Sequence, residues 1–190
     1  NNSEDVAQMI ADTILEKYNA YIIDADKIGH NIIKKGNKAY FEIIEHFGKD
    51  ILNIDNEINR KKLGNIVFND KEKLSCLDNI THKYIIKEIK DTINIIKEKG
   101  EYKYIVIDAP LLVKTNLHKI VDKVWLVHCS LETRLKRLIK RDNLSEDILL
   151  KRINKQIPFE ENKKYADFII INEDRENLEE FIKQQLKKEV

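Results

Sequence analysis

The sequence predicts a doubly wound α/β domain, in which helices cover both faces of a parallel sheet. Short apolar runs alternate along the 190 residues with longer amphipathic stretches, as is typical of strands joined by crossover helices. The runs are rich in β-branched and aromatic residues and apolar almost throughout, as expected for strands buried on both faces. Four runs fit this description: residues 20–23, 104–107, 124–127 and 168–171.

The amphipathic stretches predict the helices. The clearest is a stripe of isoleucines that ends near Gly100, a residue type that commonly stops a helix. The stretch from about Ile28 to Thr81 contains no convincing strand and several short helical patterns, so we interpret it as a helical insertion between two strands. Residues at helical spacing define the stripe and the other helices: Val6, Met9, Ile10, Thr13 and Ile14; Ile85, Ile89, Ile93 and Ile96; Leu135, Leu138 and Ile139; and Leu178, Phe181, Ile182 and Leu186.

Charge and composition narrow the classes of function. Lysine plus arginine (34) nearly balances aspartate plus glutamate (33), so the net charge of +1 gives no reason to expect binding to nucleic acid or to an anionic membrane. No stretch approaches the roughly 20 apolar residues of a membrane span, and no signal peptide is recognisable. Cys76 and Cys129 lack metal-ligand spacing, and we expect buried thiols without a disulfide. We therefore expect a cytoplasmic protein.

Two carboxylates follow the first apolar run. Asp24 and Asp26 come where the run ends and a helix begins, at the carboxyl edge of a parallel sheet, where ligands bind in such folds. Residues two apart at the end of a strand can point to the same side. Such a pair could orient a sugar hydroxyl and accept its proton, or hold water around Mg²⁺. The alternative is that one of them caps the following helix.

A third acid, Asp108, ends the next apolar run and precedes Pro110, which forces the chain out of the sheet. Many nucleotide-binding folds place the carboxylate that orients a metal ion at the end of a strand. Asp108 would then add a third acid to the same edge; the alternative is an ordinary turn residue.

Arg134, Arg137 and Arg141 are three and four residues apart, so they line one face of a predicted helix. The planar guanidinium group suits phosphate oxygens, and a mobile helix of this kind can close over a triphosphate. The alternative is a solvated basic face, which a lysine-rich chain produces easily.

The order of these residues resembles that of the dephospho-coenzyme A kinases. Asp24-Ala25-Asp26 followed by His30 is similar to the DAD…H element of that family. Each matching piece is weak alone, but the ordered series, from about Val6 to Asn172, is specific. The other matching positions follow in the order of the family: Phe47, Gly48, Ile58, Arg60, Leu63, Val67, Phe68, Ile80, His82, Asp108, Pro110, Leu111, Leu112, Arg137, Arg141, Gln156, Ala166, Asp167 and Asn172.

The resemblance implies a three-layer α/β/α P-loop kinase fold with a parallel sheet, a helical substrate lobe and a helical lid. The implied core comprises about residues 1–27, 100–133 and 156–190, the lobe about 28–99 and the lid about 134–155. It also implies that ATP, with Mg²⁺ as cofactor, donates its γ-phosphoryl group to the ribose 3′-hydroxyl of dephospho-coenzyme A. We expect a monomer or a weak homo-oligomer.

The resemblance assigns a first set of residues to the acceptor. Asp26 would be the general base for the hydroxyl, with Asp24 beside it. Arg60, His82 and His30 would help to hold dephospho-coenzyme A.

A second set belongs to ATP. Asp108 would lie close to the phosphates, and Arg137 would stabilise charge on the transferring group. Arg141 and Arg134 would lie on the same lid. Such a division of roles suits phosphoryl transfer, in which positioning and charge stabilisation supply most of the acceleration.

The sequence also departs from the family pattern. The Gly-rich phosphate loop, its lysine and its Mg²⁺-binding hydroxyl cannot be located, and we expect them upstream of Asn1. Lys83 stands where proline is usual, Lys114 where glutamate is common and Arg134 where glutamine is frequent. These differences bear on acceptor fit and affinity.

Two other functions stay open. One is a P-loop kinase that acts on another nucleoside or nucleotide, against which Arg60 and His82 argue. The other is a non-catalytic nucleotide- or coenzyme A-binding module. The presence of Asp24, Asp26, Arg137 and Arg141 argues against it, because a pure binder needs no acid at a hydroxyl. A GxxxxGK[ST] stretch upstream would favour the enzyme.

Overall fold

The computed structural model describes residues 17–68, 70–142, 144–153, 158–173 and 178–187. Their contacts divide the chain into two compact units, one formed by Ile23–Ala109 and the other by Asn1–Ile22 with Pro110–Val190. The division into core, lobe and lid that the resemblance implies stays a prediction.

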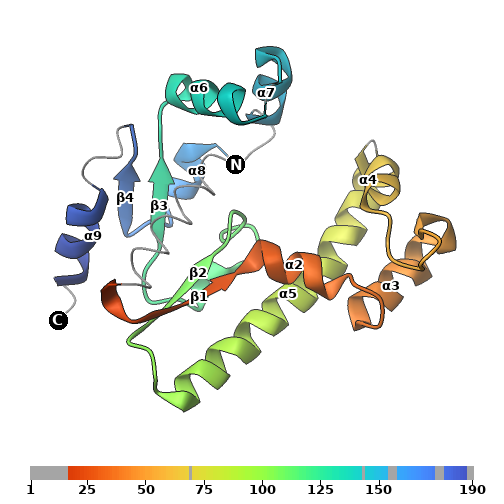
Figure 1. The fold of residues 1–190 in the computed structure, drawn as a ribbon, viewed down its shortest axis with the longest axis horizontal. Helices are drawn as coiled ribbons and strands as arrows, with labels where there is room; N and C mark the ends of the chain where they lie inside the picture. Colours follow the sequence, from red (N-terminus) through yellow and green to blue (C-terminus); the bar gives the residue numbers. More distant parts are fainter. Residues whose placement is uncertain (1–16, 69, 143, 154–157, 174–177, 188–190) are drawn as a thin grey trace. The chain divides into compact units, whose positions relative to one another are not determined.

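The unit formed by Ile23–Ala109 is mainly helical (Figure 1). Strand β1 leads into it, and strand β2 ends it. In chain order its elements are β1 (Ala20–Asp24), α2 (Ala25–Ile32), α3 (Lys38–Phe47), the 3-10 helix η1 (Lys49–Ile51), α4 (Arg60–Phe68), α5 (Lys71–Lys99) and β2 (Tyr104–Asp108).

Helix α5 is capped at both ends. The side chain of Asp70 accepts hydrogen bonds from the backbone N–H groups of Glu72 and Lys73. Gly100 ends the helix in the left-handed conformation, with φ of 64°, which glycine adopts without the steric cost of a Cβ. The predicted stop at Gly100 is confirmed, and the helix begins at Lys71, well before the isoleucine stripe.

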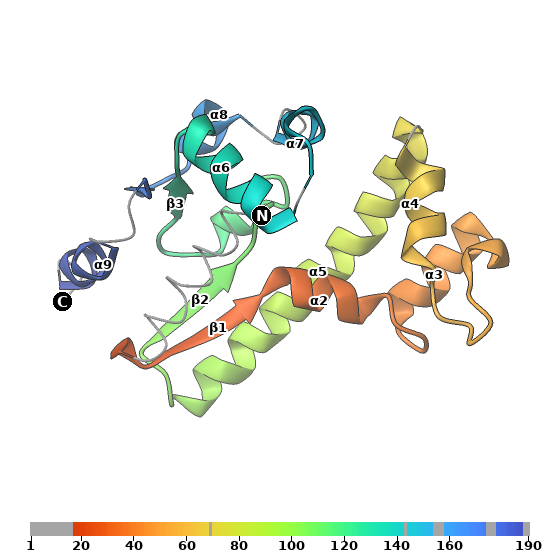
Figure 2. The ribbon, with the colours of Figure 1, turned by 45° about the horizontal axis from the view of Figure 1, so that its top comes forward.

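Strands β1 and β2 are hydrogen-bonded neighbours in one sheet. Figure 2 shows that both run in the same direction. Their last residues, Asp24 and Asp108, therefore lie at the same edge of this sheet. The strands predicted at 20–23 and 104–107 are confirmed, and each is one residue longer than predicted.

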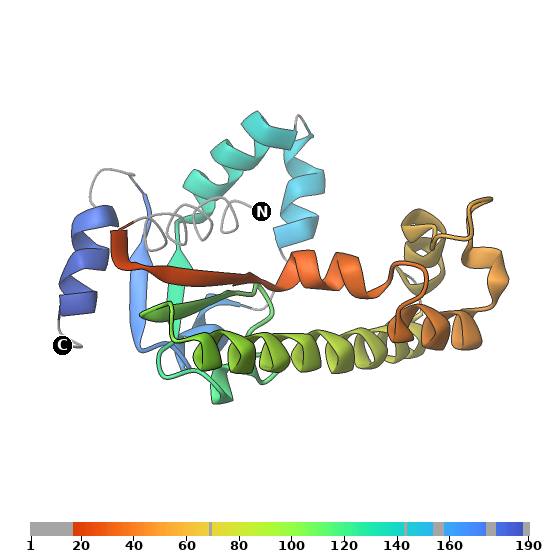
Figure 3. The same cartoon turned by 60° about the horizontal axis from the view of Figure 1, so that its bottom comes forward.

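Helix α2 follows β1 directly and packs against α5 (Figure 3). The absence of a side chain at Gly29 permits the close approach, because a Cβ there would lie 3.3 Å from Cδ1 of Ile85. Ile89, one turn further along α5, is fully buried. The isoleucine stripe thus provides the surface on which α2 lies.

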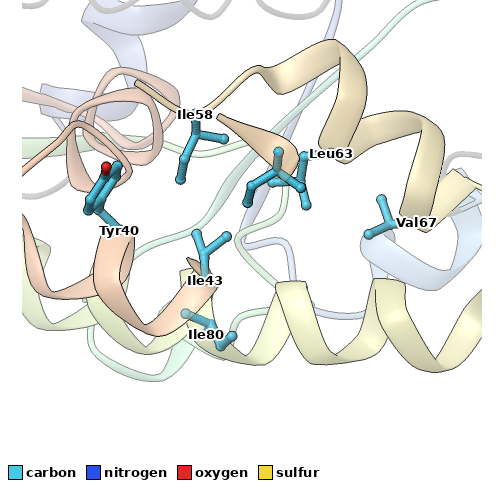
Figure 4. Packing of buried hydrophobic residues seen from close by; sticks show 7 residues of the cluster. Tyr40, Ile43, Ile58, Leu63, Val67 and Ile80 are labelled. Carbon is cyan, nitrogen blue, oxygen red and sulfur yellow. The ribbon is translucent and has the colours of Figure 1, made fainter. Parts of the chain in front are cut away.

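A core of apolar side chains lies among α3, α4 and α5 (Figure 4). Burial of each large aliphatic side chain contributes on the order of 1.5–3 kcal/mol, so this core holds the helices that carry Arg60 and His82. Its buried members are Tyr40, Ile43, Ile51, Ile58, Leu63, Val67 and Ile80.

The other unit contains a parallel pair of strands, in which Trp125 lies opposite Phe168 and His128 opposite Ile171. Trp125 is half-buried and packs edge-on against Phe168 and Phe181. The elements of this unit are η2 (Leu117–Lys119), β3 (Trp125–His128), α6 (Leu131–Asp142), α7 (Glu146–Ile153), α8 (Phe159–Lys163), β4 (Phe168–Ile171) and α9 (Leu178–Lys187).

These elements confirm the strands predicted at 124–127 and 168–171 and the helices predicted after each of them. The helix predicted from Val6 to Ile14 lies outside the described residues. Cys76 and Cys129 are both free, as predicted, but both are half-buried, so the expectation of buried thiols was wrong. Within the part of the chain that is described, no helix combines the length and apolar character needed to span a membrane.

Candidate active site

Asp24 is the last residue of β1 and the N-cap of α2. Its backbone is extended (φ −88°, ψ 106°), and its carboxylate Oδ1 accepts a 2.8 Å hydrogen bond from the backbone N–H of Lys27. An N-cap aspartate usually accepts a hydrogen bond from an N–H group of the first turn that has no partner within the helix. The capping alternative is therefore realised at Asp24, whose second carboxylate oxygen is not used by this bond.

Asp26 lies in the first turn of α2 and is exposed. The sequence argument that Asp24 and Asp26 share one side of a strand end was wrong, because the helix begins at Ala25 and strand alternation stops there. Asp26 is instead one turn before His30, which is also exposed. The two side chains therefore share one solvent-facing side of α2.

Asp108 ends β2, beside the end of β1, and is half-buried. The structure thus brings Asp24, Asp26 and Asp108 to one edge of the β1–β2 sheet, as predicted. Two of them end neighbouring strands, and the third lies in the first turn of the helix that follows the first strand. This edge is a concentration of acceptors for hydroxyl groups, water or a cation.

Arg60 and His82 lie on two helices that pack together. Arg60 is the exposed first residue of α4, and His82 is half-buried near the middle of α5. His82 precedes the buried Ile89 by two helical turns, so it lies on the stripe of α5 that also contacts α2. His82 therefore belongs to the same helical face that supports the Asp26 helix.

Lys83, the residue that replaces the usual proline, lies within the unbroken helix α5. Its ammonium group binds the Glu42 carboxylate at 2.8 Å, and the Tyr84 hydroxyl donates to the same carboxylate at 2.7 Å. These hydrogen bonds, that of Lys83 first, lower the pKa of Glu42. Glu42 and Lys83 border a shallow groove of about 640 Å³ between α3 and α5.

Arg137 is held by the segment that follows β4. Its Nη1 donates to the backbone carbonyl of Asn172 at 3.1 Å, and its Nη2 donates to Oδ1 of Asn172 at 3.3 Å and to the carbonyl of Glu173 at 2.8 Å. The predicted basic face lies on α6, since Arg134 and Arg141 are on the same helix. In this structure Arg137 therefore serves to join α6 to the end of β4.

Glu173 is a residue that sequence reasoning missed. Its carboxylate accepts hydrogen bonds from the Thr133 hydroxyl and from the backbone N–H and hydroxyl of Ser130, at the start of α6. The bond from Thr133, followed by those from Ser130, lowers the pKa of Glu173. Its partners lie 40 and 43 positions earlier in the chain, so no local pattern could have identified it.

The described residues contain no cluster of three or more histidine, cysteine, aspartate or glutamate side chains that could hold a metal ion. The pair formed by Asp24 and Asp108 is compatible with a different arrangement, in which phosphates and water supply most ligands of a magnesium ion and the protein adds one or two carboxylates.

Comparison with known proteins assigns the family. The family model for dephospho-CoA kinase matches residues 7–178. The chain belongs to the dephospho-CoA kinase family. The dephospho-CoA kinase of Carboxydothermus hydrogenoformans is 43% identical over 159 residues, which cover 84% of this chain and 77% of the relative. That of Aquifex aeolicus is 41% identical over 182 residues, which cover 96% of this chain and 87% of the relative.

Solved structures agree with this assignment. The dephospho-CoA kinase from Campylobacter jejuni matches with a TM-score of 0.65 and 29% identity, over 97% of this chain and 90% of that chain. The Thermus thermophilus protein TT1252 matches with a TM-score of 0.79 at 21% identity, over 96% of this chain and 91% of that one, and supports the fold alone. The predicted α/β P-loop kinase fold is confirmed.

Proposed function

We propose that this kinase transfers the γ-phosphoryl group of ATP to the ribose 3′-hydroxyl of dephospho-coenzyme A, which yields coenzyme A and ADP. The observation that carries the proposal is the exposed carboxylate of Asp26 at the start of α2, at the sheet edge that Asp24 and Asp108 share. An acid at this edge of an α/β sheet is placed where such folds bind ligands.

Asp26 is the general base in this proposal. It accepts the proton of the 3′-hydroxyl as that oxygen forms a bond to the γ-phosphorus and the bond between the γ-phosphorus and the β,γ-bridging oxygen breaks. Capping of α2 by Asp24 contributes by fixing the first turn, in which Asp26 lies. Acceleration then depends on the position of the hydroxyl relative to the phosphate.

The acceptor is held by residues of the helical unit. Arg60 supplies a fork of donors suited to a phosphate of the acceptor. His30 lies on α2, the same helix as Asp26, and His82 lies on α5, which packs against α2. Their imidazole groups can donate hydrogen bonds to sugar or phosphate oxygens.

The nucleotide donor requires cationic groups and a magnesium ion. Arg134 and Arg141 lie on the same helix as Arg137, and the proposal assigns these arginines to the phosphate charge of ATP. Asp24 and Asp108 are the carboxylates that would hold Mg²⁺ through its water ligands. When bound with ATP, Mg²⁺ supplies neutralisation of phosphate charge. Cytoplasmic location and a monomer or weak homo-oligomer stay predictions.

A coupled ADP-release assay on the full-length protein tests the function. Dephospho-coenzyme A, adenosine, AMP and CMP are compared as acceptors, with and without Mg²⁺. The proposal predicts turnover that depends on both dephospho-coenzyme A and Mg²⁺. Turnover only with a nucleoside or nucleotide would show that dephospho-coenzyme A is not the acceptor. A folded protein that phosphorylates none of these compounds would be a binding module.

A further inference from the structure

Asn172, the residue directly after β4, carries a buried donor without a partner. The residue is only 3% exposed, and its Nδ2 has no hydrogen-bond partner among the described residues. An unsatisfied buried donor costs on the order of 1–3 kcal/mol, so such a group is more often paired. A ligand that supplies an acceptor atom would remove this cost.

The orientation of that amide is fixed from two directions. The backbone N–H of Asn172 donates to the carbonyl of His128 at 2.8 Å, which extends the β3–β4 pairing by one residue. Its Oδ1 accepts from Nη2 of Arg137, so the oxygen side of the amide is turned toward the guanidinium group. Nδ2 is therefore directed away from Arg137, at the carboxyl end of a parallel strand, the edge at which ligands bind in such folds.

The position of Arg137 depends in turn on Glu173. The Glu173 carboxylate holds the start of α6 through Ser130 and Thr133, while Arg137, one turn after Thr133, holds the backbone of Asn172 and Glu173. The two contacts are reciprocal: the strand end supports the helix, and the helix supports the strand end. A carboxylate at a helix N-terminus is also favoured by the helix dipole.

A cap for α6 would explain Glu173 alone. It would not explain why Arg137 approaches the side-chain oxygen of Asn172, nor why the amide nitrogen stays buried without a partner. A relay from Glu173 through Arg137 to Asn172 accounts for all of these features.

We propose that Glu173 is a positioning residue for nucleotide binding, which acts through Arg137 to hold the Nδ2 of Asn172 as a donor to the nucleoside triphosphate. The inference rests on the proposed function, since it takes the ligand to be the ATP of that reaction. Nδ2 is covered by protein atoms, so the nucleotide must displace the atoms over it. Neither Glu173 nor the amide takes part in the bond-breaking step.

The test is calorimetric titration of the full-length protein with the β,γ-imido analogue of ATP, without dephospho-coenzyme A. Four proteins are compared: wild type, Glu173→Gln, Asn172→Ala and the double variant. Each single change should weaken binding about tenfold, as expected for loss of about one hydrogen bond. In the double variant the loss should not exceed that of Asn172→Ala, because residues of one relay are not additive.

Two further variants keep the test decisive. Thr133→Val removes one contact of Glu173 without touching Asn172 and should weaken binding in the same direction if Glu173→Gln fails to fold. Asn94→Asp, at an exposed position of α5, is the control and should bind as wild type. Unchanged affinity for the ATP analogue in Glu173→Gln would overturn the relay. The same holds if the double variant weakens binding by the product of the two single fold-changes. The proposed acceptor can fail without altering this result, since no acceptor is present.

Discussion

The Asp24 carboxylate accepts a hydrogen bond from the backbone N–H of Lys27 and so closes the first turn of α2. Asp26 lies inside that turn and is left exposed. One aspartate of the pair therefore shapes the helix start, and the other is available to an acceptor hydroxyl. Asp24 thus has a capping role that is distinct from its proposed role in holding Mg²⁺, and substitutions can separate the two.

Asp24→Asn should keep the free energy of unfolding within about 0.5 kcal/mol of wild type, because asparagine caps helices as well as aspartate does. Asp24→Ala should lower it by about 1 kcal/mol. Both variants should lose turnover if the charge of Asp24 helps to hold water around Mg²⁺. Urea unfolding and ADP release measure the two effects. Full turnover in Asp24→Asn would limit this residue to capping.

Arg60→Ala should raise the KM for dephospho-coenzyme A about tenfold or more, since it removes the charge-assisted hydrogen bond that the proposed function assigns to Arg60 and the acceptor. The KM for ATP should stay unchanged. Lys61→Ala, at the neighbouring exposed position of α4, is the matched control for loss of positive charge. Steady-state kinetics with each substrate varied in turn distinguish the outcomes. A rise in the KM for ATP alone would remove Arg60 from the acceptor site.

Lys83→Pro should destabilise this chain by about 3 kcal/mol, because proline removes a hydrogen bond inside α5 and clashes with the preceding turn. Lys83→Ala should cost much less than the proline substitution, since the ion pair with Glu42 is on the surface. Urea unfolding of both variants gives the comparison. Equal stability of the two would mean that α5 bends at this position without cost.

Glu173 should make stability depend on pH in the acidic range. Hydrogen bonds from Thr133 and Ser130 hold its folded-state pKa below the ordinary value of 4.5. Its contribution is therefore fully present above pH 4.5 and is lost as the pH falls through the lowered folded-state pKa. The difference in unfolding free energy between wild type and Glu173→Gln should shrink from neutral pH to about pH 3. A difference that does not change with pH would contradict the role of the ionised carboxylate.

The strands could be predicted from the sequence because each is a short run rich in β-branched residues and apolar almost throughout. Sequence reasoning placed Asp26 on a strand because the run and the helix meet without a loop, and only the bond from Lys27 to Asp24 fixes the boundary. It could not find Glu173 or the unpaired amide of Asn172, whose contacts join segments 35 to 43 residues apart. Local patterns predict elements, whereas such contacts depend on how the elements pack.

The most direct measurement is the rate of coenzyme A formation by wild type and Asp26→Asn, with ATP, Mg²⁺ and dephospho-coenzyme A all saturating. Loss of the general base should reduce the rate at least about a hundredfold. Affinity for the imido analogue of ATP should stay within about twofold, because the proposed function assigns Asp26 to the acceptor and not to the donor. Asp50→Asn, at another exposed aspartate, should turn over as wild type. Coenzyme A formation by Asp26→Asn at the wild-type rate would contradict the account.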